Sequence, residues 1–295
     1  MQIIDRVKNS IKSRKFTRRN RSIGGDLGLM ILLGAFALFS AYPLVYAINN
    51  AFKPLSEIFL FPPKLFVQNP TFDNFFDLST IIGNSWVPFS RYMFNTLFIT
   101  ILGTGGTVLL GTMAAYPLAK YNFPGSKVMS NIIVYALMFN STVTAIPNYI
   151  IMSKMGLVNS YWAVILPVIG STLGLYLMKN FIVQIPMALV ESAKIDGATE
   201  FRVFWSVIIP LCKPAWITLC ILSFQTLWGA TGGTFIYSEN LKPISYALSQ
   251  VVGGGIARTG VASAVSLIMM IVPVTVFVIS QSNVIETMAS SGMKD

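Results

Sequence analysis

The chain has 295 residues, of which 54% are hydrophobic and only 11% are charged, and its mean hydropathy is +0.66. Soluble domains carry about 25% charged residues, so this chain has too few of them to cover a large core with a water-facing surface. Histidine is absent and there are two cysteines, which excludes histidine-based acid–base catalysis, histidine metal sites and a disulfide-stapled secreted scaffold. The composition predicts an all-α membrane protein.

The N-terminal segment, residues 1–25, is the most basic part of the chain. Its first 21 residues contain eight Lys or Arg and one acidic residue, Asp5, and so supply +7 of the net charge of +10. Positive charge directly before a hydrophobic stretch is typical of a cytoplasmic orientation signal that also contacts anionic lipid. We therefore predict a basic cytoplasmic segment at the lipid bilayer, and no nucleic-acid partner.

Six long stretches of the chain contain no charged residue. A Lys, Arg or Asp at the bilayer centre costs about 2.5 to 3.5 kcal/mol, and about 20 residues of helix are needed to cross the hydrocarbon. The six stretches have 24 to 28 residues each and run over 27–52, 92–119, 128–153, 155–178, 214–238 and 259–285. They predict six transmembrane helices, the first over 26–52. The alternative, six buried helices of a soluble protein, would require polar outer faces that these stretches lack.

The distribution of basic residues predicts the orientation. Short cytoplasmic loops retain Lys and Arg, and with the N-terminus inside, 15 of the 21 basic residues lie on the cytoplasmic side. An even number of helices returns the C-terminus to the same side, so both termini are cytoplasmic. We therefore expect an extracytoplasmic loop over 53–90, a core of five helices over 91–285 and a cytoplasmic tail over 286–295.

Small residues recur at every fourth position in the second stretch. They are Gly103, Thr107, Gly111, Ala115 and Ala119. Such a stripe on one helix face lets the backbone of another helix approach closely. The alternative is a chance pattern in a glycine-rich membrane protein.

Polar side chains are concentrated in the third and fifth stretches. In lipid they should turn inward, where they either bond to neighbouring helices or line a polar path whose hydroxyl and amide groups suit a sugar. The candidates for such a path are Asn140, Thr144, Asn148, Gln225 and Trp228. Both interpretations stay open on the residues alone.

The chain lacks residues that a self-contained pump or an enzyme would need. None of the six stretches contains Asp or Glu, so the usual carboxylate of a proton relay is missing. There is also no G-x-x-x-x-G-K-[ST] phosphate-binding loop. Uphill transport would therefore need energy from a partner. A secondary carrier or channel is the alternative, and an intramembrane enzyme, for which no nucleophile with a base in reach is evident, ranks last.

The loop between the fourth and fifth stretches, 185–210, has the pattern of a short helix with a sharp end. Pro186 can open a helix, because its missing N–H is not needed in the first turn. Gly197 can end the helix in the left-handed region that other residues avoid. The prediction is a small exposed helix between these two residues, and the alternative is a solvated connection.

This loop resembles the EAA loop of bacterial ABC-importer permeases. The matching pieces are Glu191-Ser192-Ala193, Gly197 and Val207-Ile208-Ile209-Pro210, with the spacing of the family pattern kept. Lys194-Ile195-Asp196 and Phe61-Pro62-Pro63 are similar to carbohydrate-uptake permeases related to the smaller membrane subunit of the maltose transporter. The resemblance implies the type I ABC importer permease fold.

The resemblance also implies partners and roles. The chain would pair with a second permease, bind two ATPase subunits and receive substrate from an extracytoplasmic solute-binding protein at the bacterial inner membrane. The loop would be the coupling helix, which contacts an ATPase through Glu191, Ser192, Ala193, Asp196 and Gly197. No cofactor is expected on this chain, because ATP and magnesium would be held by the ATPase subunits.

The last outer connection and the C-terminal tail carry two further expectations. The run Gly253, Gly254 and Gly255 is either an ordinary linker or a loop that, in similar permeases, reaches into the binding protein. The tail over 283–292 resembles a branch associated with larger or acidic oligosaccharides, such as those derived from alginate or pectin. The sequence as a whole predicts the non-catalytic permease subunit of an ATP-driven sugar or oligosaccharide importer.

Overall fold

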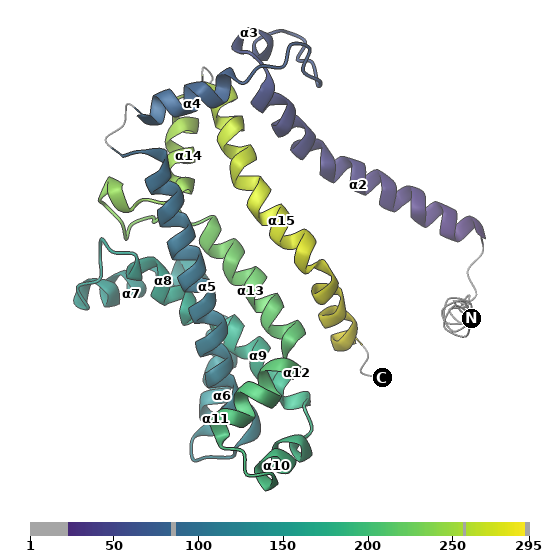
Figure 1. The fold of residues 1–295 in the computed structure, drawn as a ribbon, viewed down its shortest axis with the longest axis vertical. Coiled ribbons are helices and arrows are strands. Elements are labelled where there is room, and N and C mark those ends of the chain that lie inside the picture. Colours follow the sequence, from purple (N-terminus) through teal and green to yellow (C-terminus); the bar gives the residue numbers. More distant parts are fainter. Residues whose placement is uncertain (1–22, 84–86, 256–257, 293–295) are drawn as a thin grey trace, which may run out of the picture.

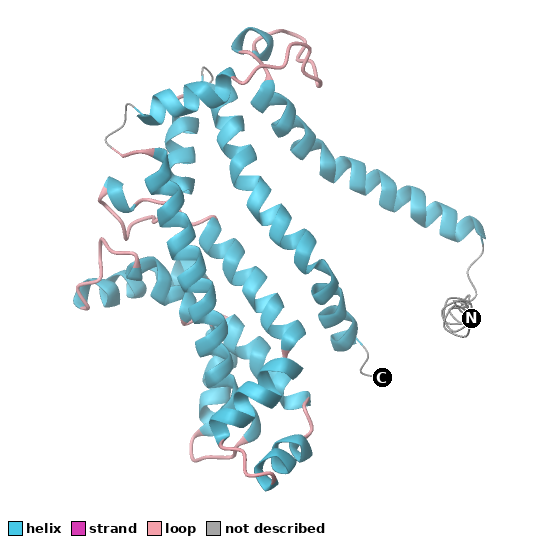
Figure 2. Cartoon of the chain, in the orientation of Figure 1, coloured by secondary structure: helices cyan, strands magenta, loops and turns pink. Residues whose placement is uncertain are grey.

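The computed structural model describes residues 23–83, 87–255 and 258–292 (Figure 1). Every regular element in these ranges is a helix, and none is a strand (Figure 2). The predicted all-α class is therefore confirmed. Nearly all of the basic segment predicted over 1–25 lies outside the described residues.

The helices differ widely in length. In chain order they are α2 (Ile23–Phe52), α3 (Leu55–Ile58), α4 (Asp73–Gly83), α5 (Phe89–Lys120), α6 (Ser126–Ala136), α7 (Ser141–Lys154), α8 (Trp162–Ile169), α9 (Thr172–Gln184), α10 (Met187–Ile195), α11 (Glu200–Val203), the π-helix η1 (Phe204–Ile208), α12 (Ile209–Leu211), α13 (Lys213–Trp228), the 3₁₀-helix η2 (Glu239–Leu241), α14 (Ile244–Gly253) and α15 (Thr259–Gly292).

Within the described ranges, four helical segments are long and apolar enough to cross a membrane. They are Gly24–Phe52, Phe89–Lys120, Trp162–Gln184 and Thr259–Gln281. A fifth crossing exists if Glu200–Leu211 and Lys213–Trp228 are counted as one span, although the two parts meet at 80°. The predicted first, second, fourth and sixth spans are thus present. A total of six and the cytoplasmic placement of both termini stay predictions.

The third predicted span is not one continuous helix. Helices α6 and α7 have 11 and 14 residues, and a break over 137–140 separates them. At 1.5 Å per residue, 14 residues reach about 21 Å, which is less than the roughly 30 Å of hydrocarbon. The break has a local cause, because the Asn140 side chain accepts a hydrogen bond from Thr142 N at 3.2 Å and so caps a new helix. The expectation of one helix over 128–153 is wrong, since a lack of charge does not reveal a cap.

Two other boundaries differ from the predicted ones. The fourth span is predicted over 155–178 but lies at Trp162–Gln184. It therefore includes Lys179 near its C-terminal end, where a long side chain can extend to the membrane surface. Helix α13 ends at Trp228, ten residues before the end of the predicted stretch. Gly232 and Gly233 follow with φ angles of +78° and +43°, which do not continue a right-handed helix.

Helix α5 is the centre of the bundle. It packs against α8, α9 and α13, and glycines make these contacts close. A Cβ atom on Gly103 would lie 2.4 Å from Leu227 Cδ1, and one on Gly106 would lie 2.6 Å from Ile169 Cδ1. Gly103 belongs to the predicted stripe of small residues, so the stripe includes a close helix contact of the kind expected in a membrane, whereas Gly106 lies outside it.

Buried side chains gather at both ends of α5. The larger cluster lies where the C-terminal end of α5 meets α9, α10, η1 and α13. A second cluster joins the N-terminal part of α5 to α4, α14 and α15. The two ends of α5 are thus held by different sets of helices.

Helix α2 is packed differently from the other long helices. None of the residues in its most apolar window is buried. Figure 1 shows it leaving the bundle at an angle from a junction near α3 and α15. An exposed surface that is apolar all round is typical of a membrane span.

Gly103→Leu tests the contact between α5 and α13. The new side chain would occupy the space of Leu227, and overpacking of this kind costs about 1 to 3 kcal/mol. We expect a lower midpoint of thermal unfolding for the purified protein in detergent. The control is Gly105→Leu, where no described atom lies within 4 Å of the added Cβ. Equal losses in the two variants would contradict the close approach.

Candidate functional site

Helix α10 is bounded by the two residues that local backbone rules select. Pro186 precedes it in an extended conformation, and Gly197 follows it with a φ of +81°. Gly197 N donates to Lys194 O at 2.9 Å. Ala198 N donates to Ala193 O at 3.0 Å, which completes the bond pair of a Schellman helix end. The predicted short helix with a glycine stop is confirmed.

Helix α10 has one face packed on its own chain and one face that is open. Val190 is fully buried and belongs to the same cluster as Val203. Glu191 and Ser192 are exposed, and Ile195 is 86% exposed. The open face therefore offers a carboxylate, a hydroxyl and an aliphatic side chain for contact with another molecule.

An open groove of about 370 Å³ lies between α10 and the segment formed by η1 and α12. Its lining includes Leu189, Ser192, Ala193, Asp196, Val207 and Pro210. Three of the five predicted coupling residues, Ser192, Ala193 and Asp196, thus line the same groove as Pro210, the proline that ends the predicted motif. Glu191 lies outside this lining, on the exposed face of α10.

The chain turns sharply after this groove. Helices α11, η1 and α12 run from Glu200 to Leu211, and α13 leaves at 80° to them. Pro210 and Pro214 lack the N–H that a continuous helix needs. Trp216 Nε1 donates a hydrogen bond at 3.2 Å to the backbone carbonyl of Ile209, the first residue of α12. This bend holds η1 and α12 beside α10.

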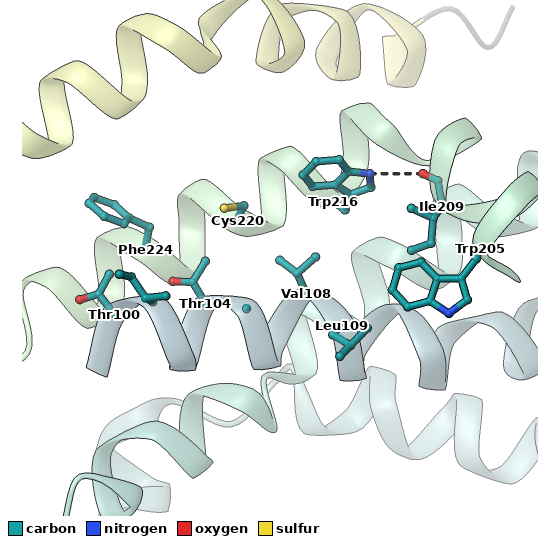
Figure 3. A pocket seen from close by; sticks show the side chains of 11 residues that line it. Thr100, Thr104, Val108, Leu109, Trp205, Ile209, Trp216, Cys220 and Phe224 are labelled. Atoms are coloured by element: carbon teal, nitrogen blue, oxygen red, sulfur yellow. Dashed lines mark hydrogen bonds between the residues drawn. The ribbon is translucent and has the colours of Figure 1, made fainter. Parts of the chain in front are cut away.

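A larger cavity of about 510 Å³ lies between α5 and α13 (Figure 3). Its lining includes Thr100, Thr104, Trp205, Trp216, Cys220 and Phe224. The Oγ1 atoms of Thr100 and Thr104 are buried and have no hydrogen-bond partner among the described residues. Other buried threonines of α5, such as Thr107, donate to the carbonyl four residues earlier. No sequence pattern indicated this cavity, because it depends on how two distant helices pack.

The predicted path residues lie in two separate places. Asn140 caps α7, and Thr144 and Asn148 belong to α7, which Figure 1 shows to the left of α5 while α13 lies to its right. Gln225 is exposed on α13. Trp228 is buried, and its Nε1 donates to a backbone carbonyl of α15 at 2.9 Å. The candidates thus lie at two different helices, α7 and α13, and a path shared by both stays a prediction.

The predicted binding-protein loop forms the end of a helix. Gly253 is the last residue of α14, and Gly254 N donates to Val251 O at 3.1 Å. Gly255 has a φ of +83°. The glycine run is thus an ordered turn rather than a free linker as far as residue 255, and 256–257 lie outside the described residues. Its contact with a binding protein stays a prediction.

The N-terminal part of α5 carries polar contacts that sequence reasoning missed. Asn95 Nδ2 donates to Asn240 O and to Lys242 O, each at 2.8 Å. Thr96 Oγ1 accepts from Ile244 N at 2.8 Å. The partners are 145 to 148 positions apart, so no local pattern could have indicated them.

A comparison with known protein families identifies the family to which this chain belongs. Residues 107–289 match the family described as binding-protein-dependent transport system inner membrane component. The match covers more than half of the chain and includes α10 with its groove. The chain belongs to this family. The predicted resemblance to ABC-importer permeases is therefore confirmed.

Two similar permeases are named for the transport of carbohydrates. The galactooligosaccharides transport system permease protein GanQ of Bacillus subtilis (strain 168) is 28% identical over 275 residues, which cover 90% of this chain and 94% of the relative. The polygalacturonan/rhamnogalacturonan transport system permease protein YtcP of the same organism is 30% identical over 239 residues, covering 77% of this chain and 78% of the relative.

A solved structure has the same fold. It is a chain of a bacterial ABC transporter involved in the import of the acidic polysaccharide alginate, and its TM-score is 0.77 over 90% of this chain and 99% of that chain, at 22% identity. At this identity the likeness shows the fold alone. The predicted type I ABC importer permease fold is confirmed.

Gly197→Val tests the glycine stop of α10 in this permease. The left-handed conformation costs a residue with a side chain about 1 to 2 kcal/mol, and the open space around Gly197 leaves φ as the main obstacle. We expect the last turn of α10 to fray, so that its amide hydrogens exchange about 5 to 30 times faster in hydrogen-exchange mass spectrometry. Gly197→Asn, which tolerates this φ, is the matched control. Wild-type exchange in Gly197→Val would contradict the role of the glycine.

Proposed function

We propose that this chain is a membrane-spanning subunit of an ATP-driven, binding-protein-dependent importer of sugars or oligosaccharides. The support is its membership of the permease family, the carbohydrate permeases among its relatives, and a short helix that projects from the spans with one face open. The open face of α10 beside its groove is the observation that carries the proposal, because a translocation subunit without its own energy source needs a surface on which force can act.

Partner subunits provide the energy for transport. This sequence contains no phosphate-binding loop, so two ATPase subunits bind ATP and magnesium, and the chain itself is a non-catalytic translocation subunit. A second permease completes the membrane part, and an extracytoplasmic solute-binding protein delivers the substrate. Both termini and α10 lie on the cytoplasmic side of a bacterial inner membrane.

The chemistry of α10 suits an ATPase contact. Glu191 is exposed and makes no ion pair in the part of the chain that the structure describes. It is therefore available for a charge-assisted hydrogen bond to a basic side chain of the ATPase. Ser192, Ala193 and Asp196 line the adjoining groove, which can receive a side chain of the same partner. Gly197 sets the direction in which the chain leaves this contact.

The substrate class is an oligosaccharide, and an acidic oligosaccharide is the narrower proposal. The two relatives are named for galactooligosaccharides and for polygalacturonan/rhamnogalacturonan. The six charge-free stretches hold no Lys or Arg that could bind a carboxylate, so the binding protein or the second permease selects the charge. Amides and hydroxyls on α7 and α13 bond to the sugar along the path, and the turn over 253–255 contacts the binding protein.

Co-purification in mild detergent tests the proposal. The tagged chain should retain an ATPase, and Glu191→Lys should lower the amount of bound ATPase about tenfold or more, because it replaces an attraction across the interface by repulsion. Asp77→Lys is the control, since Asp77 is exposed on α4, which lies far along the molecule from α10 (Figure 1). Equal retention in Glu191→Lys and wild type would contradict the contact.

Transport separates the proposal from its alternative. Liposomes that contain this chain with its second permease and ATPase subunits should take up oligosaccharide only when both ATP and the binding protein are supplied. Uptake by this chain alone, without an ATPase, would show a self-contained carrier or channel and would contradict the proposal.

A further inference from the structure

Four side chains form a polar cluster, which we call the inner clamp, at the C-terminal end of α5. They are Tyr116, Tyr121, Lys194 and Glu200. Lys194 Nζ lies 2.5 Å from Glu200 Oε1 and donates to Tyr121 Oη at 2.9 Å. Tyr116 Oη and Tyr121 Oη donate to Glu200 Oε2 at 3.1 and 2.8 Å. Each member is therefore bonded to at least one other member.

The inner clamp joins the end of α5 to α10 and α11, with bonded partners 73 and 84 positions apart in the sequence. Tyr116 belongs to the last turn of α5, and Tyr121 directly follows that helix. Lys194 lies in the last turn of α10, and Glu200 begins α11. The clamp thus fastens the C-terminal end of the coupling helix, and the helix after it, to the end of α5.

The inner clamp is more than a surface ion pair. The side chains of Lys194 and Glu200 are 36% and 56% exposed, and a pair so exposed contributes little by itself. Here Lys194 Nζ also lies 4.9 Å from the centroid of the Tyr121 ring, and Tyr116 is buried. The hydrogen bond to Glu200 raises the pKa of Lys194 to about 12, because it stabilises the charged form of the lysine. A network of this kind fixes the geometry better than an isolated pair.

Further contacts secure α5 at both of its ends. Near the clamp, the Lys120 ammonium donates to the Ile185 carbonyl, just ahead of α10. At the other end, Asn95 donates to the carbonyls of Asn240 and Lys242. Helix α5 is continuous over its 32 residues, with Pro117 near its C-terminal end. It therefore connects the coupling loop with the segment that leads into α14.

We propose that the inner clamp makes α5 the element that receives the movement of α10. Lys194 and Glu200 hold the end of α10 against α5 through Tyr121, and all three are positioning residues. When an ATPase subunit displaces α10, α5 moves with it as one body, and the movement reaches the segment over 239–244. This inference rests on the proposed function, since it takes α10 as the ATPase contact.

An exchange of charges tests the inner clamp. Lys194→Glu and Glu200→Lys each bring like charges together, whereas the double variant restores opposite charges. The measurement is made on the assembled complex, and the probe is trigalacturonate or galactotriose, whichever of the two the binding protein retains. Each single variant should still bind its ATPase subunits. The ratio of stimulated to basal ATPase activity should fall about two- to fivefold in each of them. The double variant should regain most of that ratio. Lys154→Glu, exposed at the end of α7, is the control.

Hydrogen exchange on the permease without its partners provides an independent measurement. The amides of residues 187–198 should exchange about two- to fivefold faster in both single variants and at the wild-type rate in the double variant. Tyr121→Phe removes one hydroxyl and no charge, so it should give a smaller acceleration. If a charge variant fails to fold, Tyr121→Phe still tests whether the clamp holds α10 on α5.

Two results would overturn the inference. One is unchanged exchange and unchanged stimulation in both single variants. The other is a double variant as impaired as the single ones, because Lys194 would then act on another subunit rather than on Glu200. If the wild-type protein retains no ATPase, the proposed function fails, and the exchange rates still decide whether the clamp holds α10 on α5.

Discussion

Close packing around α5 is the constraint on which the other elements depend. Gly103 and Gly106 leave no room for a side chain against α13 and α8, so these helices approach α5 in one arrangement only. The position of α13 then sets where the chain bends by 80°, and that bend places η1 and α12 beside α10. The groove next to α10 is thus a consequence of how the long helices pack, and the loop alone does not determine it.

Polar contacts complete this arrangement at the two ends of α5. A buried amide or hydroxyl in a lipid-embedded bundle needs a partner, because no water is available to it. Asn95 finds its partners ahead of α14, and Tyr116 finds one in Glu200 after α10. Between these ends, Thr100 and Thr104 have none among the described residues and lie at the cavity between α5 and α13. Polar bonds thus join α5 to other elements at both of its ends, and Thr107 adds one between them by donating to Val168 O at 3.2 Å.

Sequence rules predicted the local features and missed those that depend on distant residues. A lack of charge identified four spans, because a charge in lipid is costly, but it could not show that Asn140 starts a new helix or where α13 ends. Pro186 and Gly197 predicted α10, since both act on their own backbone. The predicted coupling residues came from the resemblance to the EAA loop, and three of them line the groove. The inner clamp could not be predicted, because Tyr116 and Glu200 are 84 positions apart and only the packing of α5 brings them together.

The distance between the start of α5 and α10 tests whether these two helices move as one body. Spin labels at Ser90, exposed at the start of α5, and at Ala188, exposed on α10, report this distance when Cys212 and Cys220 are replaced by alanine. In the assembled complex, we expect pulsed electron paramagnetic resonance to give the same distance between the labels in the nucleotide-free and ATP-bound states. A distance that changes on ATP binding would show that α10 separates from α5 or slides along it, and would contradict transmission through α5.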